Sequence, residues 1–116
     1  MIQIPRLLLV CGNSMNPTYK DGEYLLSMPI SFKRIKEGDV LIFRTPYDQK
    51  RVVIKRVAMK ATLSNELFFL GDNPSESYDS RNYGFIPYKY VLGKVTDQRQ
   101  KGERSSYGEQ CKAVND

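Results

Sequence analysis

Short apolar runs separated by polar turns make up most of this chain. Each run is rich in Leu, Val, Ile or Phe and is bounded by Gly, Pro, Asn, Asp or Ser, which is typical of β-strands joined by turns. No segment of helix length has an amphipathic pattern. The pattern predicts a mainly β, compact, barrel-like domain. Its expected strands are residues 2–11, 24–28, 40–43, 52–60, 66–70 and 91–96.

The chain divides into an apolar-rich domain and a polar segment of about twenty residues at its C-terminal end. Residues 1–97 contain all the expected strands, whereas residues 98–116 contain almost no aliphatic side chains and are expected to form a flexible tail. The apolar run at residues 2–11 is broken by Pro5 and Arg6 and is shorter than the roughly twenty residues of a transmembrane helix. This favours a soluble, cytoplasmic protein, with a membrane-peripheral location as the alternative.

Composition excludes several kinds of site. The chain has no histidine, so Ser-His-Asp and Cys-His arrangements are ruled out. The net charge is +5, but the basic residues are scattered along the chain and accompany no nucleic-acid-binding motif. No nucleic-acid partner is therefore expected. Cys11 and Cys111 lie far apart in the sequence, and no metal or cofactor is expected. The sequence does not decide whether these two cysteines form a disulfide. The alternative is that Cys11 is a small buried residue at a strand end.

Ser14 and Lys55 are the candidates for chemistry. A serine hydroxyl is a weak nucleophile and needs a base beside it, and a lysine can accept the proton only when neutral. The pKa of that lysine must then fall by roughly three units, which requires an apolar setting. Alternation along the strand places Val53, Lys55 and Val57 on one apolar face. The alternative interpretation is a half-exposed lysine whose amine reaches solvent.

Three ordered segments together resemble the conserved boxes of type I signal peptidases. Residues 12–18 (GNSMNPT) resemble the nucleophile box, and residues 55–57 (KRV) resemble the lysine box. Residues 71–84 (GDNPSESYDSRNYG) resemble the downstream Gly-Asp-Asn…Ser-x-Asp-Ser-Arg…Gly box. The resemblance covers about residues 7–96. It implies a serine endopeptidase with a Ser/Lys dyad that removes an N-terminal leader or signal segment from a precursor.

The resemblance is to a short member of that family. The chain shows no membrane anchor ahead of the nucleophile and is in this respect similar to the peptidases that mature nickel-type superoxide dismutases. Larger signal peptidases continue the lysine box with Gly-x-Pro-Gly-Asp and often carry an inserted second domain. Residues 58–62 (AMKAT) replace that continuation here, so no large insert is expected.

The resemblance also implies roles for individual side chains. Ser14 would attack the scissile carbonyl and form an acyl-enzyme, with Lys55 as the general base in both steps. Ser77 aligns with the serine that hydrogen-bonds the lysine amine. Asp79 and Arg81 align with an ion pair that braces the loop, and this pairing would keep the carboxylate from raising the lysine pKa.

Other positions of the boxes are expected to shape the site. The backbone N–H of Ser14 is the first donor to the oxyanion. Some family members place a serine two positions before the nucleophile as a second donor, but this chain has Gly12 there, so that donor is a backbone group or is missing. Residues expected to support the site structurally are Met15, Pro17, Gly71, Asp72 and Asn73.

Substrates of this family bind as extended strands along a sheet edge, with small residues in the pockets before the cut. The expected partner is therefore a protein precursor bound as an extended peptide, and peripheral contact with a membrane stays open. Two alternatives use the same fold. One is a fragment of a self-cleaving regulator of the LexA type, and the other is a catalytically inactive peptide-binding module.

Overall fold

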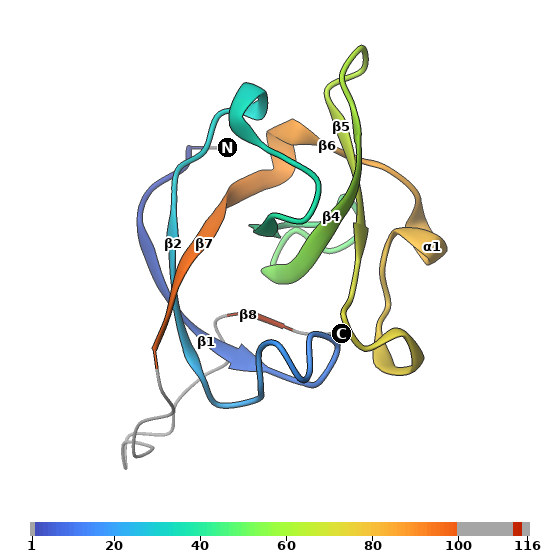
Figure 1. The fold of residues 1–116 in the computed structure, drawn as a ribbon. Helices are drawn as coiled ribbons and strands as arrows, with labels where there is room; N and C mark the ends of the chain where they lie inside the picture. Colours follow the sequence, from blue (N-terminus) through green and yellow to red (C-terminus); the bar gives the residue numbers. More distant parts are fainter. Residues whose placement is uncertain (1, 100–112, 115–116) are drawn as a thin grey trace.

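The computed structural model describes residues 2–99 and 113–114. It confirms a mainly β domain with little helix (Figure 1). The strands in this part of the chain are β1 (Arg6–Cys11), β2 (Tyr24–Met28), β3 (Val40–Phe43), β4 (Val53–Ala61), β5 (Glu66–Leu70), β6 (Ile86–Pro87), β7 (Val91–Arg99) and β8 (Ala113–Val114). The short helical turns are η1 (Phe32–Arg34), η2 (Pro74–Glu76), α1 (Ser80–Tyr83) and η3 (Tyr88–Tyr90).

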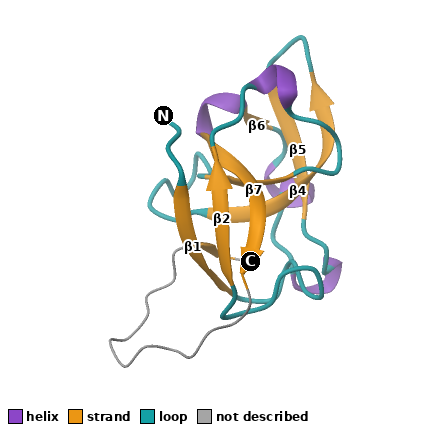
Figure 2. Ribbon diagram, turned by 60° about the vertical axis from the view of Figure 1, so that its left-hand side comes forward, coloured by secondary structure: helices purple, strands orange, loops and turns teal. Residues whose placement is uncertain are grey.

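The strands form one strongly curled sheet. Its order is β3-β7-β2-β1-β8-β4-β5-β6, and a further pairing of β3 with β4 connects the sheet back on itself. Figure 2 shows β1, β2 and β7 side by side, with β4 and β5 on the other side of the molecule. Among the described pairings, β8 runs parallel to both of its neighbours and the other pairs are antiparallel. The result is the barrel-like arrangement that the short alternating runs predicted.

Two apolar clusters fill the interior. One is built around Leu8, Val10, Leu25 and Ile42. The other contains Phe43, whose ring stacks on Phe69 with 4.0 Å between the ring centroids. All four residues of β3 are buried because alternate side chains of that strand enter alternate clusters. Burial of each large apolar side chain contributes about 1.5–3 kcal/mol, so β3 is a central stabilising element.

Six of the eight strands in the described residues agree with the expected ones apart from their ends, whereas β6 and β8 were not expected. β1 begins at Arg6, because Pro5 has no N–H to donate to a strand ladder. β7 extends to Arg99, beyond the expected boundary at residue 97. The segment expected to be a tail contributes β8, and its residues 100–112 and 115–116 lie outside the described residues. Within the described residues, no helix has the length and apolar character needed to cross a membrane.

Candidate active site

Ser14 and Lys55 meet in the interior of the domain. Ser14 lies on the loop that follows β1, and Lys55 lies in the first half of β4. A hydrogen bond of 2.7 Å joins Lys55 Nζ and Ser14 Oγ. Both residues have 0% of their surface exposed. The alternative of a half-exposed lysine reaching toward solvent is therefore wrong.

The surroundings of the Lys55 side chain are set by strand alternation. Val57 is buried in the cluster around Phe43, and Val53 packs against the same cluster. Leu41, directly beside Lys55 in the antiparallel pairing of β3 with β4, is also fully buried. Desolvation penalises the charged form of an amine, and these neighbours of Lys55 are apolar.

Residues 12–23, which carry the candidate nucleophile Ser14 and which we call the nucleophile loop, are held by local hydrogen bonds. Gly12 directly follows β1 and has a φ of 91°, a conformation that glycine adopts without steric cost. The Gly12 N–H donates to Asp21 Oδ1 at 2.9 Å. Further along, the Tyr19 N–H donates to the Met15 carbonyl at 2.9 Å, and Met15 is fully buried in the core. These contacts fix the position of the backbone on both sides of Ser14. Pro17 follows a cis peptide bond in the same loop.

The loop after β5 packs directly against the nucleophile. The Asn73 N–H donates to the Ser14 carbonyl at 2.7 Å, and the Asn73 side-chain amide donates to the Asn13 carbonyl at 3.0 Å. The Asp72 N–H contacts Met15 Sδ at 3.3 Å. The sequence predicted Asp72 and Asn73 as turn formers, but their contacts to the nucleophile loop depend on the fold. Asn73 therefore helps to hold the Ser14 backbone in place.

Asp79 is fully buried and has several donors around it. Its carboxylate accepts hydrogen bonds from Arg81 Nε at 2.9 Å, from the Gly71 N–H at 2.9 Å and from Ser77 Oγ at 2.8 Å. Burial by itself would raise the pKa of Asp79, but the hydrogen bonds from Arg81, Gly71 and Ser77 hold that pKa below its usual range. Asp79 also caps α1 through the Arg81 N–H. The carboxylate is thus ionised and paired within its own loop.

Ser77 lies between Asp79 and the nucleophile loop. A side chain on Gly71 would overlap the Ser77 hydroxyl and would lie 2.8 Å from the Ser14 carbonyl oxygen. Glycine at position 71 therefore permits the close approach of these segments. Since Ser77 Oγ donates its proton to Asp79, its lone pairs are available to accept a hydrogen bond from an amine.

An ion pair that the sequence did not predict connects the segments that carry Ser14 and Lys55. Arg56, next to Lys55, donates from Nε and Nη2 to the two oxygens of Asp72 at 2.9 and 2.7 Å. Thr18 Oγ1 donates to Asp72 Oδ2 at 2.6 Å, and Arg56 Nη1 donates to the Gly38 carbonyl at 2.7 Å. We call this group the Arg56–Asp72 clamp. The hydrogen bonds from Arg56 lower the pKa of Asp72.

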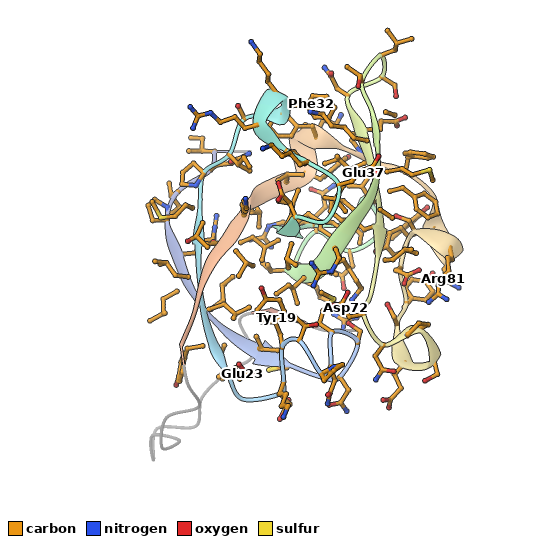
Figure 3. The ribbon with its side chains drawn as sticks, viewed as in Figure 1. Tyr19, Glu23, Phe32, Glu37, Asp72 and Arg81 are labelled. Atoms are coloured by element: carbon orange, nitrogen blue, oxygen red, sulfur yellow. The ribbon has the colours of Figure 1, made fainter. Side chains whose placement is uncertain are left out.

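Figure 3 places Asp72 and Tyr19 at the same end of the molecule, opposite Phe32, with Arg81 to one side. The clamp and the Asp79–Arg81 pair are two separate ion pairs. No group of three or more Cys, Asp or Glu side chains in the described ranges could hold a metal ion. Cys11 is not a free thiol, and Cys111 lies outside the described residues.

Known proteins with similar sequences match most of this chain. Residues 4–62 and 59–97 match the family described as signal peptidase, peptidase S26. The human mitochondrial inner membrane protease subunit 1 is 31% identical over 109 residues, covering 77% of this chain and 66% of that protein. The Arabidopsis thaliana mitochondrial ATP-independent inner membrane protease subunit 1a is 33% identical over 109 residues, covering 74% of this chain and 65% of that protein.

A bacterial relative is much longer than this chain. Signal peptidase I of Buchnera aphidicola is 30% identical over 89 residues, which is 72% of this chain and 29% of that protein. The chain spans slightly less than two thirds of the length of the two mitochondrial relatives. The family match nevertheless covers β1 to β6, most of β7, the buried Ser14–Lys55 contact and the loop after β5. The chain therefore belongs to the signal peptidase family, peptidase S26.

Proposed function

We propose that this chain is a serine endopeptidase that removes an N-terminal leader or signal segment from a protein precursor, with Ser14 and Lys55 as its catalytic dyad. The observation that carries the proposal is the 2.7 Å contact between two fully buried side chains, a hydroxyl and an amine. The family match and the protease names of the relatives support hydrolysis of a peptide bond. The substrate is a precursor bound as an extended peptide.

Acylation begins with the neutral Lys55 amine. Lys55 takes the proton of Ser14 Oγ as the oxygen attacks the scissile carbonyl. The C–N bond then breaks, and Lys55 returns the proton to the departing amine of the mature protein. The leader remains attached to Ser14 as an ester. A water molecule deprotonated by Lys55 attacks this ester, which frees the leader as a carboxylic acid and restores the Ser14 hydroxyl.

Charge on the tetrahedral intermediate requires a donor close to the carbonyl. The Ser14 N–H serves as the oxyanion donor. The Gly12 N–H donates to Asp21, so this amide is less suited to the role. Asn73 supports the arrangement because it holds the Ser14 carbonyl and thereby orients the peptide unit that follows the nucleophile.

The loop that carries Asp79 protects the basicity that Lys55 needs. An unpaired carboxylate beside Lys55 would favour the charged amine and remove the base. Arg81 balances the charge of Asp79, and Ser77 stands between the carboxylate and the rest of the site as a neutral group. In the proposed mechanism, a lone pair of Ser77 Oγ accepts a hydrogen bond from the Lys55 amine and orients it without adding charge.

The dyad is tested with Ser14→Ala and Lys55→Met. Each variant should cleave a pooled library of precursor peptides at least about 10³-fold more slowly than the parent, because each removes a member of the reacting pair. Mass spectrometry of the products gives the rates and the cleavage positions. Circular dichroism checks that both variants remain folded.

Matched controls are Ser64→Ala and Lys50→Met, which change exposed loop residues of the same types. Both controls should cleave at the parent rate. Undiminished cleavage by Ser14→Ala or Lys55→Met would contradict the dyad. A parent that binds peptides but cleaves none of them would instead indicate a catalytically inactive binding module.

A further inference from the structure

The C-terminal strand β8 occupies a specific position in the sheet. Its backbone pairs with the end of β1, where Val10 lies beside Ala113 and Cys11 lies beside Val114. It also pairs with the start of β4, where Val53 lies beside Val114. Both pairings are parallel. Figure 1 shows β8 next to β1, at the end of the molecule where β1 passes into the nucleophile loop. β8 thus fills the space between the edges of β1 and β4.

Those two edges are the ones that lead to the dyad. β1 ends at Cys11, shortly before Ser14, and β4 continues from Val53 to Lys55. Because β8 is parallel to both strands, a peptide in its place advances toward Ser14 and Lys55 by about 3.3 Å per residue. A peptide bond just beyond the level of Val114 would therefore come close to the 2.7 Å contact between the serine and the lysine.

We propose that β8 is an internal competitor of the substrate. It occupies the groove between β1 and β4, which we infer is the site where the leader half of a precursor binds as a parallel strand. This inference rests on the proposed function, since it assigns the groove to the substrate of Ser14. A strand of two residues forms few main-chain hydrogen bonds, so a longer extended peptide displaces it.

The chemistry of the groove suits many sequences. The edges of β1 and β4 offer backbone N–H and C=O groups, which any extended peptide can satisfy. A segment of the same chain is present at an effective concentration in the millimolar range. The fraction of molecules with an open groove is then reduced, and the apparent affinity for substrate falls by the same factor.

Truncation at residue 112 tests the competition. Removal of β8 should lower the KM for a cleavable precursor peptide about tenfold and leave kcat nearly unchanged, because an internal competitor affects binding only. Adding a synthetic peptide of residues 112–116 to the truncated chain should raise the KM again, and the same peptide with Val114→Pro, which lacks a main-chain donor, should not. An unchanged or increased KM after truncation of a chain that remains folded would overturn the proposal.

Substitutions in the full chain provide a second route. Val114→Pro removes a main-chain donor from β8 and should reproduce the lower KM, whereas Val114→Ala keeps the backbone and should leave the KM at the parent value. A purely structural role of β8 in closing the sheet predicts the opposite for Val114→Pro, namely loss of stability with no gain in substrate affinity. That result would also overturn the proposal.

A binding measurement separates this inference from the peptidase mechanism. In Ser14→Ala, an excess of the synthetic peptide of residues 112–116 should increase amide hydrogen exchange at residues 113–114, while residues 10–11 and 53 stay protected. Continued protection of residues 113–114 at saturating peptide would refute the competition even if the enzyme is active. Increased exchange at residues 113–114 would support it even if the parent cleaves no precursor, in which case only the proposed catalysis fails.

Discussion

Gly71 permits the close approach of the loop after β5 to Ser14. The position where its Cβ would lie overlaps the Ser77 hydroxyl and is 2.8 Å from the Ser14 carbonyl oxygen. The Gly71 N–H in turn donates to the buried Asp79 carboxylate. A side chain at position 71 would therefore push apart groups that act together in the proposed mechanism.

Gly71→Ala should lower kcat about 10²-fold, because a displacement of the order of 1 Å at the nucleophile has an effect of this size. Overpacking should also reduce the free energy of unfolding by about 1–3 kcal/mol. Peptide cleavage and urea denaturation measure the two effects.

Gly84→Ala is the control for this substitution. A Cβ at position 84 would have no atom within 4 Å, although the φ of 81° makes alanine strained there. The control should lose stability and keep kcat. A Gly71→Ala enzyme with the parent kcat would show that the close approach of Ser77 and Ser14 has no role in positioning.

At the level of elements, the Arg56–Asp72 clamp connects β4 to two loops. Arg56 holds Asp72 with two hydrogen bonds, and Thr18 joins the same carboxylate from the nucleophile loop. Bidentate pairing of a guanidinium and a carboxylate fixes direction as well as distance. The clamp therefore holds the strand that carries Lys55 in a fixed position relative to the loop that carries Ser14.

Arg56→Lys should reduce kcat about tenfold and leave KM close to the parent value, because a lysine cannot reproduce the bidentate geometry. A double-mutant cycle with Arg56→Met and Asp72→Asn should give a coupling free energy of about 1–2 kcal/mol. Steady-state kinetics and urea denaturation provide both numbers.

The pair of Lys94 and Asp39, 3.2 Å apart and partly exposed, is the matched control. Its coupling should stay below about 1 kcal/mol, as for surface pairs, and Lys94→Met should leave kcat unchanged. If the two pairs gave the same coupling free energy and the same effect on kcat, the proposed positioning role of Arg56 would be contradicted.

For the whole molecule, the two depressed carboxylate pKa values link folding to pH. Hydrogen bonds from Arg56 lower the pKa of Asp72, and those around Asp79 lower its pKa against the opposing effect of burial. A carboxylate whose folded pKa lies below its unfolded value binds protons more readily in the unfolded chain. Its contribution to stability is complete above the unfolded pKa of about 3.9 and is lost as the pH falls through the lower folded pKa.

The free energy of unfolding should therefore fall as the pH drops below about 4. Asp79→Asn should already be less stable at pH 7, by about 1–3 kcal/mol, and should lose less stability on acidification. Glu37→Gln, a change at an exposed carboxylate, should follow the parent curve. Urea denaturation from pH 7 to pH 3 tests this, and parallel curves for Asp79→Asn and the parent would contradict it.

Much of the fold was predictable because strand alternation is a local property of the sequence. The runs ending at Cys11, Met28, Phe43 and Leu70 are strands in the structure, and the mainly β class is confirmed. The short helix α1 was not predicted, since its four residues depend on a cap from Asp79 and not on an amphipathic repeat. The ordered motifs around Ser14 and Lys55 identified the family because each keeps its residue types at fixed spacing.

By itself the sequence determined which segments become strands and which residue types are available for chemistry, since both are carried by short stretches of chain. Only the tertiary structure decided that Lys55 is fully buried against Ser14, that Arg56 pairs with Asp72, and that Ala113–Val114 enters the sheet. These contacts join residues far apart in the sequence. Their partners are chosen by how the sheet curls and which strand edges it leaves open, and neither property is encoded in a local pattern.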